Sequence, residues 1–378
     1  MTPSDVERLS NEYPPAEPRE GRLPRALQVD APAWRQLGIE ILSDFDEHAF
    51  GIGWWAPHPG TSRRILISDH LLACVQSVET NLIEARLHFV ELDDFWERER
   101  RFLARAVSLS PGGRLQVRFP EPRRPLDEIA RAMAALHLTG FVRAVAGVLD
   151  CFGASVVGVL ALKTPLLRAD LGSARKALAQ IAAVDAGARI QTQFRADLEG
   201  LIARTGAQGW LQWALDMRNM LVHRGRRFQP SELRPLPTGV VGPDGRQILR
   251  TEVIPQLPRD PGRSDVEMFL DATHPPVLTE GAGATIRGVL DSTLEVVRGG
   301  AALLLDIWRT RRASPTLLLQ PREQWLNGVS SESTGFEGYA PGSVPYNPTS
   351  ITVDPIMIQR LKCASLGDAA RPAWAAFD

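Results

Sequence analysis

The feature that most constrains the fold is a continuous apolar run from residue 144 to residue 162, AVAGVLDCFGASVVGVLAL. As a helix it is nearly long enough to span a bilayer. A single acid, Asp150, interrupts it near the middle, and an acid at the centre of a membrane helix costs about 2.5–3.5 kcal/mol. Three glycines in the run also permit close helix packing. We therefore expect a buried helix of a helical bundle, with a membrane-spanning helix as the alternative.

Helical periodicity extends well beyond this run and predicts a helical domain over residues 63–313. Ser68 or Asp69 is expected to cap its first helix, which continues to about residue 107. Short connections between the middle helices favour antiparallel neighbours. The further helices are expected at about 127–163, 170–183, 189–204, 207–224 and 283–312.

The remaining segments are poor in helical pattern. Residues 1–62 are expected to form an N-terminal tail with a short strand near Gly51–Trp55, and residues 314–378 an irregular C-terminal tail. The segment 229–280 is dense in Pro, Gly and Arg, and within it VVGPDGRQILRTEVI predicts a β-hairpin turning at Pro-Asp-Gly. The expected fold class is therefore mainly α: an antiparallel helical bundle with a small β-hairpin insertion and irregular tails.

The composition indicates in which cellular compartment the protein is found. The net charge of −1 gives no global attraction to nucleic acid or membrane. Arginine greatly outnumbers lysine, 40 to 3, which a GC-rich genome explains, although Arg also suits phosphate. Three widely separated cysteines argue against a disulfide framework. Together with a first segment that has no apolar signal-peptide core, this favours a cytoplasmic protein.

The stretch WALDMRNMLVHRGRR, residues 213–227, carries the main candidate site. Projected as a helix, Gln212, Asp216, Asn219 and His223 form one polar stripe. Arg218 instead falls among apolar positions, where a guanidinium must be paired or must face a cavity or another subunit. Asp150 is the only acid in the apolar run of residues 144–162. We hypothesise that it approaches Arg218; a subunit interface around Arg218 is the alternative.

The residues RNMLVH, Arg218 to His223, resemble the motif of the HEPN superfamily, in which an Arg, a polar residue such as Asn, a short spacer and a His lie late in a helical bundle. The resemblance covers about residues 127–312. It implies a homodimer in which two motifs face each other, and in catalytic members RNA cleavage without metal. It also implies a role as a toxin or phage-defence effector, with an antitoxin or regulatory protein as a partner. Other relatives are non-catalytic modules that bind a partner protein or nucleotide, which is the alternative function.

The residues themselves fit RNA cleavage by attack of the 2′-OH on the adjacent phosphate, which needs a base, an acid and a cation. His223 suits proton transfer near neutral pH, and Arg218 suits phosphate oxygens. Asn219 is expected to orient His223 or to hold the substrate, and Asp216 to support the site. The products would carry a 2′,3′-cyclic phosphate and a 5′-OH. One His per protomer favours a dimer, which would supply both an acid and a base. No metal or cofactor is expected.

Basic residues follow directly after the motif: Arg224, Arg226 and Arg227. They are interpreted either as cations favoured at a helix C-terminus or as a patch that binds the RNA phosphates. His223 itself has the alternative of merely ending its helix.

Three rival patterns are weaker. Ser173-Ala-Arg-Lys176 matches SxxK, but the accompanying motifs of serine β-lactam enzymes are absent. The glycine-rich GAGATIRG, residues 281–288, is better explained as a helix start than as a nucleotide loop. Five clustered acids could bind a metal but are better explained as a solvated helix face. These acids are Glu91, Asp93, Asp94, Glu97 and Glu99.

Overall fold

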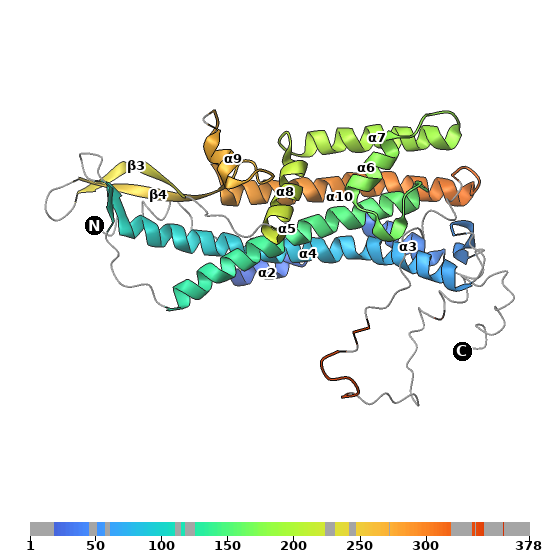
Figure 1. Ribbon diagram of the computed structural model, residues 1–378, viewed down its shortest axis with the longest axis horizontal. Helices are drawn as coiled ribbons and strands as arrows, with labels where there is room; N and C mark the ends of the chain where they lie inside the picture. The colour runs from blue at the N-terminus through green and yellow to red at the C-terminus, as the bar shows by residue number, and fades with distance from the viewer. Residues whose placement is uncertain are drawn as a thin grey trace. The chain divides into compact units, whose positions relative to one another are not determined.

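The computed structural model describes most of the chain between residues 19 and 318, with short gaps. The described residues are 19–44, 51–56, 61–109, 115–117, 125–223, 231–241, 247–271, 273–318, 335–336, 338–343 and 358. Within them the chain is mainly helical with a small antiparallel sheet, as the sequence predicts (Figure 1).

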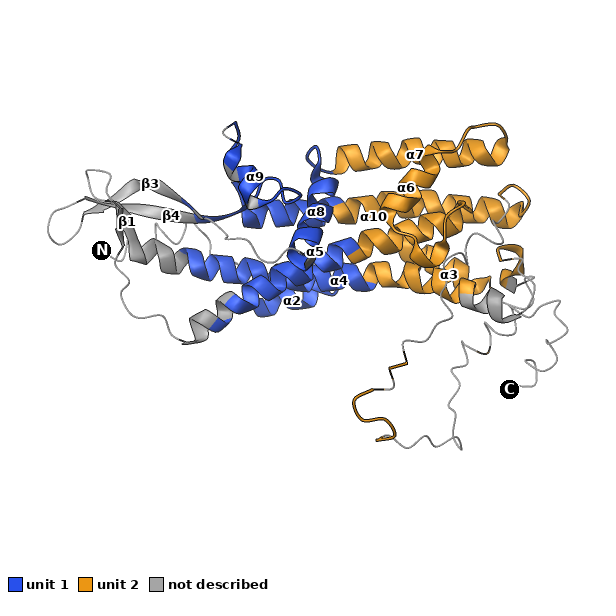
Figure 2. Cartoon of the chain, viewed as in Figure 1, with its two compact units in different colours: residues 1–30, 80–146, 206–292 blue, residues 31–79, 147–205, 293–378 orange. Residues whose placement is uncertain are grey.

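Two compact units divide the chain (Figure 2). Unit 1 comprises residues 1–30, 80–146 and 206–292, and unit 2 comprises residues 31–79, 147–205 and 293–378. Three long helices contribute residues to both units: α4 (Thr61–Ala106), α5 (Pro125–Val159) and α10 (Ala282–Ala313).

Unit 2 is built from helices around an aromatic and aliphatic core. Besides its shares of the long helices it contains α3 (Pro32–Ser43), α6 (Leu171–Ala179), α7 (Ala186–Thr205) and two short 3-10 helices, η2 (Gly51–Trp54) and η3 (Leu166–Arg168). Trp34 on α3 donates from Nε1 to the Val75 carbonyl over 2.6 Å and stacks on Phe152, with ring centroids 5.6 Å apart. These contacts place α3 against both α4 and α5 in this unit.

The apolar run that dominates the sequence is the C-terminal half of α5. Most of its side chains are buried, and those of Val148, Phe152 and Val156 are fully so, because α10 and α4 pack closely on this helix. A Cβ added at Gly300 on α10 would lie only 2.3 Å from Phe152 Cζ. The stretch Ala132–Val159 is long and apolar enough to cross a membrane, yet 78% of its apolar window is buried within the structure.

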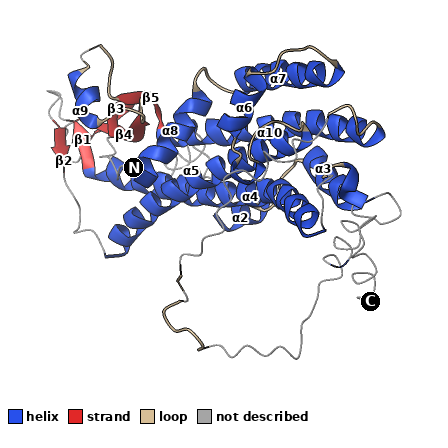
Figure 3. Cartoon of the chain, turned by 45° about the vertical axis from the view of Figure 1, so that its right-hand side comes forward, coloured by secondary structure: helices blue, strands red, loops and turns tan. Residues whose placement is uncertain are grey.

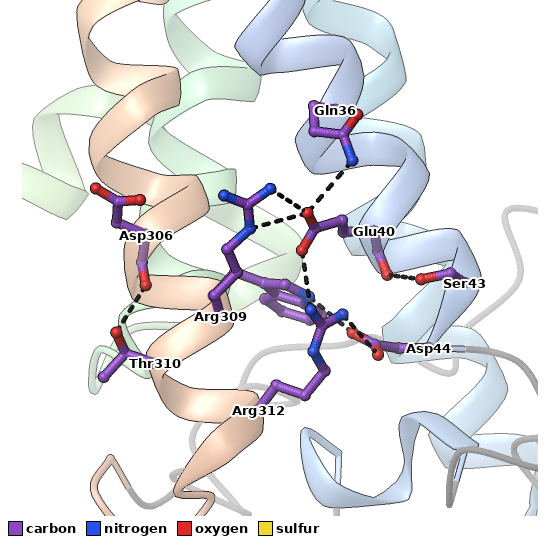
Figure 4. A network of polar contacts seen from close by, with 9 residues as sticks. Gln36, Glu40, Ser43, Asp44, Asp306, Arg309, Thr310 and Arg312 are labelled. Carbon is purple, nitrogen blue, oxygen red and sulfur yellow. Dashed lines mark hydrogen bonds and ion pairs between the residues drawn. The ribbon is translucent and has the colours of Figure 1, made fainter.

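A polar cluster joins α3 to the end of α10 in unit 2 (Figure 4). Glu40 accepts hydrogen bonds from Arg309 and Arg312, and Arg312 also bonds Asp44 over 3.2 Å. The buried Asp44 accepts a further bond from Trp308 Nε1 over 2.8 Å. The pKa of Glu40 is lowered, chiefly by its hydrogen bond with Arg309, whereas burial raises the pKa of Asp44.

Unit 1 combines helices with the sheet (Figure 3). The strands are β1 (Val107–Leu109), β2 (Leu115–Val117), β3 (Ser231–Val241), β4 (Gln247–Pro258) and β5 (Val277–Gly281). They run antiparallel in the order β2-β1-β4-β3, with β5 paired to the end of β4. Strands β3 and β4 confirm the predicted hairpin, with Val241 opposite Gln247; its Pro-Asp-Gly turn lies outside the described residues.

The remaining helices of unit 1 are α2 (Arg19–Ala26), α8 (Trp210–His223) and α9 (Asp265–Leu270). A capping box starts α9, in which Ser264 Oγ accepts from the Glu267 amide and Glu267 accepts from the Ser264 amide. This short helix and β5 were not predicted within the segment 229–280.

The structure corrects three predictions about the first hundred residues. The expected tail over residues 1–62 contains α2 and α3, and Trp34 of α3 is a core residue. The segment Gly51–Trp54 forms a 3-10 helix rather than a strand. Helix α4 begins at Thr61, so the expected caps Ser68 and Asp69 lie about two turns inside it. These segments form helices despite their Pro-rich sequence, because their tryptophan and isoleucine side chains pack against residues distant in the sequence.

Candidate functional site

Helix α8 positions the candidate motif. Gly209 adopts φ +82°, which favours glycine, and its carbonyl accepts from the Trp213 amide at the start of the helix. The buried face of the helix follows the helical period, as expected for an amphipathic element. It consists of Trp210, Leu211, Ala214, Met217 and Met220.

Arg218 lies at the border of this buried face rather than inside it. Its side chain is half-buried, and Val222, one turn on, is 46% exposed. Of the apolar residues expected around Arg218, Leu211 and Ala214 are buried and Val222 is exposed. The pairing of Arg218 with Asp150 stays a prediction, since the two residues belong to different units.

The polar stripe is present on α8 at its first two positions. Gln212 donates to Asp216 over 3.0 Å, one turn apart. Asp216 in turn lies beside the loop that follows β4, since a Cβ added at Gly262 would be 3.3 Å from its Oδ2. Trp213 Nε1 donates to the Pro258 carbonyl over 3.0 Å on the same side. The end of the insertion therefore packs directly on α8.

Asn219, the second motif residue, is exposed on the outer side of α8. His223 is the last residue of the helix, and its side chain lies outside the described part. Arg224, Arg226 and Arg227 also lie outside the described residues. The described geometry thus shows an exposed amide and a half-exposed guanidinium on adjacent positions, within the last two turns of one helix.

The rival patterns have structural roles. Ser173 is the third residue of α6 and forms a capping box with Asp170, whose carboxylate accepts from the Ser173 amide over 2.6 Å. Helix α10 starts at Ala282, as expected for the glycine-rich segment.

The clustered acids of α4 are engaged in ion pairs. Glu91 binds Arg19 of α2, and Asp93 binds Arg22 of the same helix. Asp94 and Glu97 pair with arginines of α4 itself, at positions 98 and 100. Among the described residues no group of three or more His, Cys, Asp or Glu side chains is arranged to hold a metal ion.

A cavity of about 920 Å³ lies in unit 2, between the α6–α7 connection, the end of α5 and residues 316–318. Its charged lining groups are Lys163 and Asp185, both exposed. The rest of the lining is largely aliphatic, and nothing in it converges as a catalytic set would. The motif of α8 belongs to the other unit.

Two pairs of chemically reactive side chains escaped prediction. His88 of α4 and His137 of α5 approach within 2.9 Å between their Nδ1 atoms in unit 1. In unit 2, the thiols of Cys74 and Cys151 are hydrogen-bonded to each other. Both pairs join residues far apart in the sequence, on helices whose pairing register no local pattern reveals.

Comparisons with known proteins give no relationship. No family model matches the chain, and neither a curated protein nor a solved structure is significantly similar to it.

Proposed function

We propose that this protein is a metal-independent endoribonuclease of the HEPN-like kind, acting through Arg218, Asn219 and His223. The supporting observation is the placement of the motif late in a helical bundle, where α8 exposes Asn219 and leaves Arg218 half-exposed. A guanidinium buried completely would not reach a phosphate, and one fully solvated would not be oriented. Arg218 is partly exposed and partly buried, so its guanidinium can reach a phosphate and is still held in position.

In the proposed reaction His223 transfers the proton of the 2′-OH or of the 5′-oxygen leaving group. Arg218 stabilises the charge that develops on the phosphate, an effect typically worth about 10²–10³ in rate for one positioned donor. Asn219 lies four residues before His223, hence on the same side of the helix, and holds the substrate or the imidazole. The proposed partners are RNA and a second copy of the chain, in a cytoplasmic setting, with an antitoxin or regulatory protein as a further partner.

The test is cleavage of a mixed cellular RNA in EDTA by the wild type and by Arg218→Ala, Asn219→Ala and His223→Ala. We expect each variant to lose at least about 100-fold in rate. Matched controls are Arg204→Ala, an exposed arginine of α7, and Gln193→Ala, an exposed amide of the same helix. The products should resist 3′-end ligation until the cyclic phosphate is removed. RNA binding without cleavage by the wild type would support the non-catalytic alternative instead.

The dimer is tested separately through Val222, which is 46% exposed one turn after Arg218. If two α8 helices face each other, Val222→Glu places a charge in that interface and should both lower the mass measured by light scattering and abolish cleavage. Val184→Glu is the control, because Val184 is 82% exposed on the α6–α7 connection. A wild type that is monomeric at all concentrations contradicts the shared site.

A further inference from the structure

Cys74 and Cys151 face each other across α4 and α5 within unit 2. Their thiols are hydrogen-bonded, and neither forms a disulfide in the structure. The adjacent residues fix this approach independently: Val75, next to Cys74, and Phe152, next to Cys151, both contact Trp34. The two helices are therefore held together at the level of the thiols by packing that does not depend on the sulfur atoms.

Unlike a cysteine sealed in a protein core, both cysteines of the pair keep some contact with solvent. Both thiol-bearing residues are half-buried, whereas Val75 and Phe152 are sealed, at 1% and 0% exposure. Both residues thus keep some contact with solvent in the folded helices, which access of a small oxidant requires.

A histidine adjoins the pair. His70, one turn before Cys74 on α4, has its Nε2 atom 3.6 Å from Cys74 Sγ. Burial lowers the pKa of His70, so the imidazole is neutral at pH 7, and a hydrogen bond with the Leu166 backbone helps to hold the ring. A neutral imidazole nitrogen next to a thiol can accept its proton.

From this arrangement we propose that Cys74 and Cys151 form a peroxide-reactive thiol pair that closes to a disulfide between α4 and α5. The inference concerns unit 2 alone and does not depend on the proposed ribonuclease activity.

The sulfur atoms have distinct roles. Cys151 accepts the hydrogen bond of the Cys74 thiol, which lowers the pKa of Cys151 and raises that of Cys74. The Cys151 thiolate therefore attacks a peroxide oxygen, breaking the O–O bond, and becomes a sulfenic acid while hydroxide leaves and is protonated to water. Cys74 then loses its proton to His70 and attacks the Cys151 sulfur, and the second oxygen leaves as water. Two thiols and one hydrogen peroxide thus give one disulfide and two water molecules.

The direct test treats the full chain carrying Cys363→Ser with equimolar hydrogen peroxide, quenches free thiols and maps tryptic peptides without reduction. The expected product links the peptide of residues 65–86 to that of residues 144–163. Thermal unfolding should shift upwards by about 5 °C, because the bond closes a long loop, and dithiothreitol should reverse the shift. Sulfinic or sulfonic acid on either cysteine without the linked peptide, or linkage only between chains, would overturn the proposal.

Single variants separate the steps. With Cys74→Ser, Cys151 should stop at a sulfenic acid that dimedone traps, whereas with Cys151→Ser, Cys74 should react at least about tenfold more slowly, since the thiolate is the reactive form. His70→Gln should slow closure of the disulfide but leave sulfenic acid formation unchanged, a split that loss of packing alone would not produce. Dimedone labelling of Cys74 in place of Cys151 would contradict the assigned roles.

Discussion

Two arginines, Arg218 in unit 1 and Arg311 in unit 2, show what it takes to bury a guanidinium. Both follow apolar helical sequence, yet Arg218 is half-buried and Arg311 is 1% exposed. Arg311 donates to the carbonyls of Gly158 and Val159 at the end of α5, and to that of Leu318 over 3.3 Å. The carbonyls of Gly158 and Val159 belong to the negative end of the α5 dipole, where carbonyls lack intrahelical donors.

The comparison teaches that a buried arginine need not be paired with an acid. From the sequence, a carboxylate is expected beside Arg218, with Asp150 as the candidate, whereas the Nη atoms of Arg311 donate to main-chain oxygens and its guanidinium carbon lies 5.8 Å from the centroid of the Trp54 ring. Burial lowers the pKa of Arg311 to about 9, so it remains charged at neutral pH. Arg311 is thus a buried part of unit 2, whereas Arg218 is only half-buried.

The largest expected effect comes from Arg311→Met, which removes the side-chain donor of the Val159 carbonyl and one of the two side-chain donors of the Gly158 carbonyl, the other being Trp55 Nε1. We expect a loss of about 3 kcal/mol in the free energy of unfolding, from unsatisfied carbonyls and lost packing. Urea unfolding followed by tryptophan fluorescence measures it. Arg298→Met, a half-exposed position on the same helix, is the control and should change little. Equal losses in both variants would contradict the assigned role of Arg311.

An intermediate effect is expected at Glu40, whose carboxylate binds Arg309 and Arg312. Glu40→Gln should lose about 1.5 kcal/mol at pH 7, the lower end of the usual contribution of a hydrogen bond to a charged group. Because the pKa of Glu40 is lowered in the folded state, its contribution is complete above the pKa of the unfolded chain and disappears as the pH falls through the folded value. The unfolding curves of wild type and variant should therefore converge towards pH 3; a constant difference would exclude this ionisation as the cause.

The contribution of Asp44, in the same cluster, to the free energy of unfolding has the opposite pH dependence. Burial raises its pKa, so its protonated form is favoured on folding, and the contribution is lost as the pH rises through the folded pKa. Asp44→Asn keeps an acceptor for Trp308 Nε1 and is expected to change stability at pH 7 by less than Glu40→Gln does.

The smallest effect on stability is expected for Arg218→Met. A half-exposed side chain at a helix border contributes less than about 1 kcal/mol, while the proposed loss of RNA cleavage is large. Matched unfolding and cleavage measurements on Arg218→Met and Arg311→Met therefore separate the two arginines: one variant should lose activity with little change in stability, and the other should lose stability first. A loss above 2 kcal/mol for Arg218→Met would make Arg218 structural as well.

The sequence predicts the long helices and the β3–β4 hairpin because those rest on local periodicity. Helices α5, α7 and α10 agree with the expected ranges within about four residues. Helices α2 and α3 were missed, since their stability comes from partners such as Glu91 and Val75, which are distant in sequence. Strands β1 and β2 are three residues each and depend on β4 for pairing, so they leave almost no local signal.

For the candidate site, the sequence predicts the helix and its polar stripe but not the degree of exposure. The Gln212–Asp216 bond follows from spacing alone, because residues four apart are neighbours on a helix. The contact of Asp216 with the loop at Gly262 arises from tertiary packing across the insertion and has no local signature. The same holds for the thiol pair, whose members are 77 positions apart.

Strand β3 has a consequence for solubility. It pairs with β4 on one side, and among the described strands none covers its other edge. An uncovered strand of eleven residues would normally be a template for pairing with another chain. Pro235 and Pro237 remove two main-chain donors from β3, and the pairing register shifts between Pro235 and Gly239. Because prolines reduce the capacity of a strand for main-chain pairing, we expect them to disfavour intermolecular β-aggregation through β3.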